Sequence, residues 1–272
     1  MTTRIVALCF AMLVCLLPSD GTAAAERTET GIVYRTTGDV TDAVRERCRL
    51  DISRPAEGGD LPTVIWLHGG GLTKGERQVP DALRHKGMVI VGAGYRLSPQ
   101  VQVATIIDDA AAAVAWTFGN IERYGGSPRK IYLTGHSAGG YLCLMVALDK
   151  RRLAAHGVDA NQLAGVASYS GQVITHFTAR RERGVADTTP VVDELAPLYH
   201  VRKDMPPLLL ITGDREREML GRYEENAYLW RMMNVVGHGR TTLHEVPGAD
   251  HGGMVDPAHP VFLEWMRKQV AP

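Results

Sequence analysis

The chain has 272 residues, 45% of them hydrophobic, with 30 lysine and arginine residues against 30 aspartate and glutamate residues. A chain of this length and apolar content can bury a large core, and one sizeable domain is expected. The balanced charge provides no basic surface for nucleic acid and no acidic tail, which argues against a nucleic-acid-binding protein.

The N-terminal 25 residues have the three regions of a secretory signal peptide. Arg4 supplies an early cation, residues 5–17 form an apolar run that is short for a bilayer span, and Ala23 to Ala25 are small residues suited to cleavage. We therefore expect residues 1–25 to be a signal peptide, residues 26–272 to form the mature domain, and the protein to be secreted or periplasmic.

Two other interpretations of the N-terminus stay open. An uncleaved membrane anchor would keep the apolar run in the protein. A lipoprotein signal through Cys15 is less favoured, because this chain has the large Val14 where such signals have a small residue. After cleavage we expect no stable membrane span.

The cysteines permit at most one disulfide in the mature chain. Cys9 and Cys15 leave with the signal, and Cys48 and Cys143 remain. Two buried free thiols are the favoured interpretation, and a bridge between Cys48 and Cys143 is the alternative.

Runs typical of strands alternate with runs typical of helices along the rest of the chain. Apolar runs bounded by turn residues predict strands over residues 31–35, 49–53, 62–67, 88–95, 130–134, 163–169, 207–213 and 241–246. Apolar residues at helical spacing predict helices over residues 81–86, 106–124, 141–148, 190–199, 223–236 and 260–270. This alternation predicts an α/β fold with a mainly parallel sheet, covered by helices on both faces, in which the first two strands are antiparallel exceptions.

One connection, over residues 172–206, is longer and more polar than an ordinary link between a strand and a helix. Such segments in a compact domain are usually functional or mobile. We expect residues 172–206 to form a small lid insertion.

Three consecutive glycines follow the apolar strand over residues 62–67, in His68-Gly69-Gly70-Gly71. One interpretation is a loose loop. The other is that backbone N–H groups turn toward a developing negative charge, which glycine permits because no side chain stands in the way. Gly70 and Gly71 are the expected donors.

A second glycine-rich turn, Gly135-His136-Ser137-Ala138-Gly139, joins the strand that begins at Lys130 to an apolar helix. The G-x-S-x-G pattern is typical of a sharp turn that lifts a serine hydroxyl above the edge of a sheet. The pattern is also common by chance, so a plain strand-to-helix turn is the alternative.

Polar groups recur just after the carboxyl ends of the predicted strands. The glycine loop, Ser137, the Gly213-Asp214-Arg215-Glu216 loop and Asp250-His251 all stand at such positions. Because the carboxyl ends of parallel strands share one edge of a sheet, we expect these groups to lie together.

These motifs, together with Tyr95-Arg96-Leu97-Ser98-Pro99, resemble the α/β-hydrolase superfamily. Within it, the chain is similar to small serine esterases related to hormone-sensitive lipase, kynurenine formamidase, and feruloyl and acetylxylan esterases. The resemblance covers essentially the whole mature chain and implies the α/β-hydrolase fold and hydrolysis of carboxylic esters. Leu72 is a departure, because many relatives have an aromatic residue after the glycines.

The resemblance also implies roles for the gathered residues. Ser137 would be the nucleophile, and His251 would take its proton as general base and return it as general acid. The N–H groups of Gly70, Gly71 and Ala138 would stabilise the oxyanion.

The carboxylate that orients His251 has two candidates. In such esterases the acid commonly lies three residues after the glycine that ends its strand, and counting from Gly213 leads to Glu216. Asp214 is the more usual residue type, and the choice between Glu216 and Asp214 stays open. Asp250 is interpreted as a loop residue.

The remaining histidines near these motifs are interpreted as packing residues. His136 is expected to pack beside the serine turn and His68 to shape the glycine loop. No histidine or cysteine cluster has metal-ligand spacing, so no metal or other cofactor is expected.

Export and a short lid suggest a small-molecule or carbohydrate-linked ester substrate, with a short acyl chain or an acetyl or feruloyl group. An arylformamidase-type amide hydrolase is the alternative activity. A non-catalytic binding module on the same fold is the alternative from another class, because a fold does not determine a function.

Overall fold

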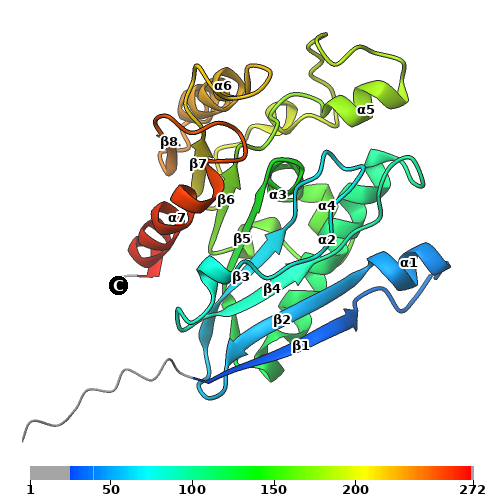
Figure 1. Ribbon diagram of the computed structural model, residues 1–272, viewed down its shortest axis with the longest axis vertical. Helices are drawn as coiled ribbons and strands as arrows, with labels where there is room; N and C mark the ends of the chain where they lie inside the picture. The colour runs from blue at the N-terminus through cyan, green and yellow to red at the C-terminus, as the bar shows by residue number, and fades with distance from the viewer. Residues whose placement is uncertain (1–24, 39, 271–272) are drawn as a thin grey trace, which may run out of the picture.

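The computed structural model describes residues 25–38 and 40–270, which form one eight-stranded sheet with helices on both faces (Figure 1). Residues 1–24 of the predicted signal peptide, which include Cys9 and Cys15, lie outside the described residues. The strand order in the sheet is β1-β2-β4-β3-β5-β6-β7-β8.

The elements follow the predicted alternation. The strands are β1 (Glu26–Val33), β2 (Arg49–Pro55), β3 (Leu61–Leu67), β4 (Val89–Ala93), β5 (Gly126–His136), β6 (Gly165–Tyr169), β7 (Leu208–Thr212) and β8 (Thr241–Glu245). The α-helices are α1 (Asp42–Arg47), α2 (Val103–Asn120), α3 (Ala138–Leu148), α4 (Lys150–Ala154), α5 (Phe177–Glu182), α6 (Arg222–Val235) and α7 (Val255–Val270). The 3-10 helices are η1 (Asp81–Leu83), η2 (Ile121–Tyr124), η3 (Ala160–Gln162) and η4 (Pro197–His200).

The pairing of the strands confirms the predicted fold class. β1 pairs with β2, and β2 with β4, in antiparallel fashion, whereas every later pairing is parallel. The carboxyl ends of β3, β5, β6, β7 and β8 therefore lie along one edge of the sheet.

Two layers of apolar side chains cover the sheet. Alternate residues of a strand point to opposite faces, so Ile65 and Leu67 of β3 join the cluster beneath α2 and α3, whereas Val64 and Trp66 join the cluster beneath α7. Figure 1 shows α7 on the other side of the sheet from α2, α3 and α4. Burial on both faces explains why the central strands are continuous apolar runs.

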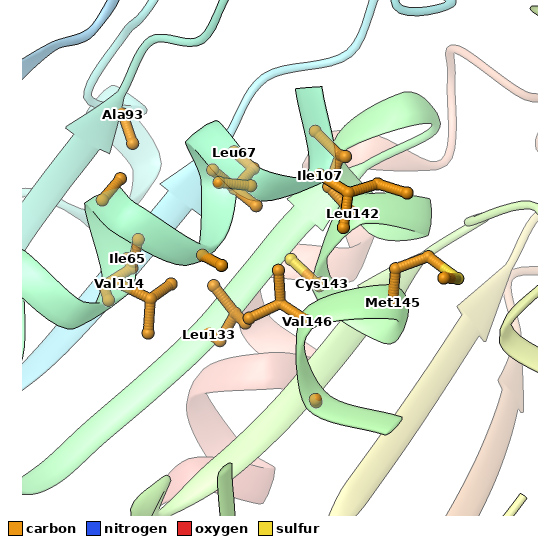
Figure 2. Packing of buried hydrophobic residues seen from close by; sticks show 14 of the residues in the cluster. Ile65, Leu67, Ala93, Ile107, Val114, Leu133, Leu142, Cys143, Met145 and Val146 are labelled. Carbon is orange, nitrogen blue, oxygen red and sulfur yellow. The ribbon is translucent and has the colours of Figure 1, made fainter. Parts of the chain in front are cut away.

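Helix α3 is buried along its whole length, from Ala138 to Leu148. Figure 2 shows Leu142 and Val146 of this helix packed toward Leu133 of β5 and Ile107 of α2. The helix that carries the serine turn is thus fixed within the core, which holds its first turn in place.

Two predicted helices are shorter than expected, and one helix was not predicted. The helix predicted over residues 81–86 is limited to η1. Residues 42–47, for which no element was predicted, form α1, which begins where the Thr41 hydroxyl accepts a hydrogen bond from the Val44 N–H at 3.4 Å. The helix predicted over residues 190–199 is limited to η4, because Asp193 accepts hydrogen bonds from the Leu195 N–H and the Thr175 hydroxyl, both at 2.9 Å. A side chain that bonds neighbouring backbone competes with helix formation.

Cys48 and Cys143 are both free and buried, so the free-thiol interpretation is confirmed. Among the described residues, no helix is long and apolar enough to cross a membrane.

Candidate active site

The turn between β5 and α3 places Ser137 at its apex with φ 56° and ψ −114°. An L-residue rarely adopts a positive φ, and the neighbouring glycines make the sharp turn possible. A Cβ atom on Gly139 would lie 2.0 Å from the carbonyl oxygen of Leu67, and one on Gly135 would lie 2.4 Å from the same oxygen. Only glycine fits where β5 and α3 approach the end of β3 this closely.

Ser137 faces a histidine from the loop between β8 and α7. The Ser137 Oγ atom lies 2.9 Å from Nε2 of His251, and both residues are partly exposed. Hydrogen-bond contact between a hydroxyl and an imidazole is the geometry that lets the imidazole accept the hydroxyl proton.

The carboxylate on the far side of His251 belongs to Glu218. Its Oε1 atom lies 2.5 Å from His251 Nδ1. The structure places neither Glu216 nor Asp214 there, which corrects both sequence candidates for the acid. Glu216 is exposed, and Asp214 accepts hydrogen bonds from the N–H groups of Gly248, at 2.7 Å, and of Glu216, at 3.0 Å.

A single helical turn explains why Glu218 takes this place. The N–H groups of Arg217 and Glu218 donate to the carbonyl of Asp214 at 2.9 and 2.8 Å. The turn carries residue 216 out to solvent and returns residue 218 to the sheet edge. The count from Gly213 assumed an extended loop and therefore led to Glu216. The only signal for Glu218 in the sequence was that it is a further carboxylate two residues after Glu216.

Glu218 is held by four donors and its side chain is 1% exposed. Oε1 accepts from His251 and from the Met219 N–H at 2.9 Å, and Oε2 accepts from the Ser170 hydroxyl at 2.5 Å and the Gly213 N–H at 3.1 Å. Burial alone would raise the pKa of Glu218, but the hydrogen bonds from His251 and Ser170 outweigh burial and lower the pKa to about 2. The carboxylate is therefore ionised throughout the neutral pH range.

His136 packs beside the site, as predicted. Its Nε2 atom lies 2.8 Å from the carbonyl oxygen of His251, and the two rings are 4.8 Å apart. Burial, together with neighbouring His251, lowers the pKa of His136 to about 4. A neutral His136 thus donates to the backbone of the loop that carries His251. Asp250 caps that loop, since its Oδ1 accepts from the Gly253 N–H at 2.7 Å.

The glycine loop after β3 lies against the serine turn. A Cβ on Gly69 would lie 3.6 Å from the Cβ of Ser137, and Gly70 and Gly71 both have positive φ, 113° and 64°. Within the described part of the chain, the N–H groups of Gly70, Gly71 and Ala138 donate no hydrogen bond. No hydrogen bond within the described residues therefore occupies these three predicted donors.

His68 shapes this loop, as predicted. Its ring stacks on Tyr95 at 4.1 Å, and its Nδ1 atom lies 2.7 Å from the Gly69 carbonyl oxygen. The Tyr95 hydroxyl donates to the His68 carbonyl at 2.5 Å. Burial lowers the pKa of His68 to about 4, so the imidazole is neutral at physiological pH.

The segment over residues 172–206 contacts the glycine loop through α5. The Thr178 hydroxyl donates to the Gly71 carbonyl at 2.6 Å, and the tip of the Phe177 ring would lie 3.2 Å from a Cβ on Gly71. Leu72, in contrast, is fully buried in the core. The aromatic surface at this loop therefore comes from Phe177, a residue that the sequence analysis did not single out.

The same segment is tied to the body of the domain at several points. Glu182 accepts from the Val103 N–H, at the start of α2, at 3.0 Å, and Glu225 of α6 accepts from the Val173 N–H at 2.8 Å. The Tyr141 hydroxyl of α3 donates to the Leu195 carbonyl at 2.7 Å. In Figure 1 the segment around α5 lies beyond the end of the sheet at which α3 begins.

The BD-FAE family model matches residues 50–180 of the chain, a range that includes the glycine loop and Ser137. Esterase LipC of Mycobacterium tuberculosis is 28% identical over 71% of this chain and 51% of that protein. Versiconal hemiacetal acetate esterase of Dothistroma septosporum is 34% identical over 40% of this chain and 35% of that protein. The chain thus spans about half or less of the length of these relatives.

Solved structures share the fold. A truncated carbohydrate esterase from gut microbiota superposes with a TM-score of 0.72 at 16% identity, covering 89% of this chain and 96% of that one. Esterase B from Lactobacillus rhamnosis superposes with a TM-score of 0.72 at 23% identity, covering 90% and 87%. At these identities the likeness concerns the fold.

Proposed function

We propose that this chain, an α/β-hydrolase by its fold and its relatives, hydrolyses carboxylic esters through an acyl-enzyme on Ser137. The observation that carries the proposal is the continuous line of contacts from Ser137 Oγ through His251 to Glu218, at 2.9 and 2.5 Å. The three side chains come from three different loops at one sheet edge. Packing of the core alone does not require this alignment.

In the first half of the proposed reaction, Ser137 Oγ attacks the ester carbonyl carbon as His251 Nε2 takes the hydroxyl proton. The carbonyl oxygen becomes an oxyanion, which the N–H groups of Gly70, Gly71 and Ala138 would stabilise. His251 then gives the proton to the leaving alcohol, the ester C–O bond breaks, and the acyl group remains on Ser137.

In the second half, water attacks the acyl-enzyme while His251 Nε2 accepts its proton. The proton returns to Ser137 Oγ as the carboxylic acid leaves. Glu218 accepts the Nδ1–H bond throughout, which fixes the ring tautomer and stabilises the imidazolium that forms in each half-reaction.

We further propose a small acyl group as substrate, either a short chain or an acetyl or feruloyl group on a carbohydrate. Phe177 supports this size limit because it stands directly against Gly71. The carbohydrate esterase among the structural neighbours agrees with such a substrate. A secreted or periplasmic location, expected from residues 1–25, would bring the enzyme to polysaccharides outside the cytoplasm.

Two experiments test the proposal. A fluorophosphonate probe should modify Ser137 in the folded protein, and Ser137→Ala should abolish both labelling and ester hydrolysis. Folded protein that neither reacts nor hydrolyses any ester would support a non-catalytic binding module.

The substrate class is tested separately. p-Nitrophenyl esters of increasing acyl length would be compared with acetylated xylan, methyl ferulate and N-formylkynurenine. Preference for N-formylkynurenine would instead support the arylformamidase alternative.

A further inference from the structure

Ser170 is a buried serine next to the candidate active site that the proposed reaction does not use. It follows β6, is fully buried, and has φ 47°. Glycine would adopt this conformation at no steric cost, whereas an L-residue is strained in it. We therefore expect the hydrogen bonds of the Ser170 side chain to include an interaction that offsets this strain.

Three hydrogen bonds fix Ser170. Its N–H donates to the Ile211 carbonyl of β7 at 2.7 Å, and its carbonyl accepts from Arg222 Nη1 of α6 at 2.6 Å. Its hydroxyl donates to Glu218 Oε2 at 2.5 Å. The side chain is thus aimed at Glu218 by a backbone that is held from two neighbouring elements.

The contact with Ser170 helps to orient the Glu218 carboxylate. Oε1 accepts from His251 and from the Met219 N–H, and the donors to Oε2 hold the opposite oxygen, so both sets of contacts define the plane of the carboxylate. The two donors to Oε2 are the Ser170 hydroxyl and the Gly213 N–H, and the latter bond is longer, at 3.1 Å. Without the hydroxyl, the carboxylate can rotate about its last bond and move Oε1 away from His251 Nδ1.

We propose that Ser170 is a positioning residue that holds Glu218 in the plane required by His251, and thereby aligns His251 with Ser137. The inference rests on the proposed function, since it assigns Ser170 a task within that reaction. Arg222 helps to hold the backbone of Ser170 in place, because its fully buried guanidinium donates a hydrogen bond to the Ser170 carbonyl.

Ser168, near the end of β6, offers a matched control two residues before Ser170. It is also fully buried, but its Oγ has no hydrogen-bond partner among the described residues. Ser168→Ala therefore removes a buried hydroxyl at the same depth without touching Glu218.

The test compares Ser170→Ala, Ser170→Gly and Ser168→Ala with the wild-type protein on a short-chain p-nitrophenyl ester. We expect both Ser170 variants to lower kcat by about ten- to a hundred-fold with KM within about twofold, as for loss of a charge-assisted hydrogen bond. Ser168→Ala should stay within about threefold in kcat. Ser170→Gly, which relieves the backbone strain, should melt at or above the temperature of Ser170→Ala.

The outcomes separate this inference from the proposed function. If Ser170→Gly folds and keeps kcat within about threefold of wild type, or if Ser168→Ala loses as much activity as Ser170→Ala, Ser170 is only a packing residue and the inference fails. In both cases Ser137→Ala would still be inactive. Activity retained by Ser137→Ala would overturn the proposed function itself.

Discussion

At the scale of single residues, Glu218 shows how local geometry selects one carboxylate among several. Three acidic residues, Asp214, Glu216 and Glu218, lie within the first six positions after β7. The helical turn that starts at Asp214 leaves Glu216 in solvent and brings Glu218 to His251. The hydrogen bonds of Asp214 serve the loop rather than the histidine.

The first prediction concerns these carboxylates. Glu218→Gln should lower kcat by about a thousand- to ten-thousand-fold, because an amide no longer stabilises the imidazolium or enforces the productive tautomer. Glu216→Gln and Asp214→Asn, measured by the same ester assay, are the controls and should stay within about fivefold of wild type. A large loss for Glu216→Gln with little for Glu218→Gln would support Glu216, one of the two candidates from the sequence, as the acid.

Phe177 is the residue to which the proposed function assigns the limit on substrate size. Its ring is partly exposed, packs against the tilted His176 ring with the centroids 4.2 Å apart, and lies under the Arg181 guanidinium at 4.9 Å. The ring is thus held on two sides while its tip points at Gly71. A large acyl group bound near the glycine loop would meet this fixed ring.

The second prediction follows from this position. Phe177→Ala should raise the ratio of kcat/KM for p-nitrophenyl octanoate to that for the acetate by about tenfold, because the vacated volume accepts additional methylene groups. Tyr199→Ala, in the same segment but 62% exposed, is the control and should leave the ratio unchanged. If Phe177→Ala left the octanoate-to-acetate ratio of kcat/KM unchanged, the acyl group would not bind against Phe177.

At the scale of elements, the close approach of β3, β5 and α3 produces the serine turn. The backbone carbonyl of Leu67 occupies the space that side chains at positions 135 and 139 would need. Because α3 is buried along its length, the turn cannot relax by moving the helix. The strained conformation of Ser137 is therefore maintained by the packing of the elements on either side.

The third prediction contrasts two glycines that lie in helices. Gly139→Ala should lower the free energy of unfolding by about 1–3 kcal/mol or more and reduce ester hydrolysis, because its Cβ would overlap the Leu67 carbonyl. Gly119→Ala in α2 meets nothing within 4 Å and should raise the free energy of unfolding by about 0.5–1 kcal/mol. Urea unfolding checks both values, and equal stability of the two variants would contradict the close approach.

The segment over residues 172–206 illustrates the limit of a prediction from composition. Its length and polarity predict a lid, and the structure ties it to α2, α3 and α6 by hydrogen bonds. We propose that it acts as a fixed wall rather than a hinged cover, because these hydrogen bonds anchor it to three helices.

At the scale of the whole molecule, buried histidines couple folding to pH. Burial lowers the pKa of His68 and of His136 to about 4, whereas an unfolded histidine has a pKa of about 6.5. Between these values the unfolded chain binds protons that the folded chain does not. Stability therefore falls as pH decreases from about 6.5 toward 4.

The fourth prediction is the shape of that dependence. The free energy of unfolding in urea should decrease as pH falls from about 6.5 to 4, and His68→Gln should show a shallower slope because one proton-binding site is lost. Glu218 affects stability at lower pH. Because its pKa is lowered from 4.5 to about 2 in the folded chain, its ionised form stabilises the fold above pH 4.5, and this stabilisation is lost as pH falls toward 2. If the free energy of unfolding depended on pH with the same slope in wild type and in His68→Gln, a lowered pKa of His68 in the folded chain would be contradicted.

Much of the fold was predictable because its signals are local and repeated. Continuous apolar runs predicted the buried strands, and their alternation with helices predicted the parallel sheet. The failures were also local: α1 depends on the Thr41 cap, and the loss of the helix over residues 190–196 on the hydrogen bonds of Asp193. Such side-chain contacts compete with the apolar pattern and leave little trace in it.

Residue patterns predicted the alternating α/β sheet and the sharp turn at Ser137, because apolar spacing and glycines constrain the backbone over a few residues. The pairing of Ser137 with His251 was implied by the resemblance to α/β-hydrolases. The contacts of Glu218 with His251, of Ser170 with Glu218 and of Phe177 with Gly71 became visible only in the folded chain. These contacts join loops that are distant in sequence. Which residues meet depends on how each loop turns after its strand. The helical turn that starts at Asp214, for example, brings Glu218 rather than Glu216 to His251.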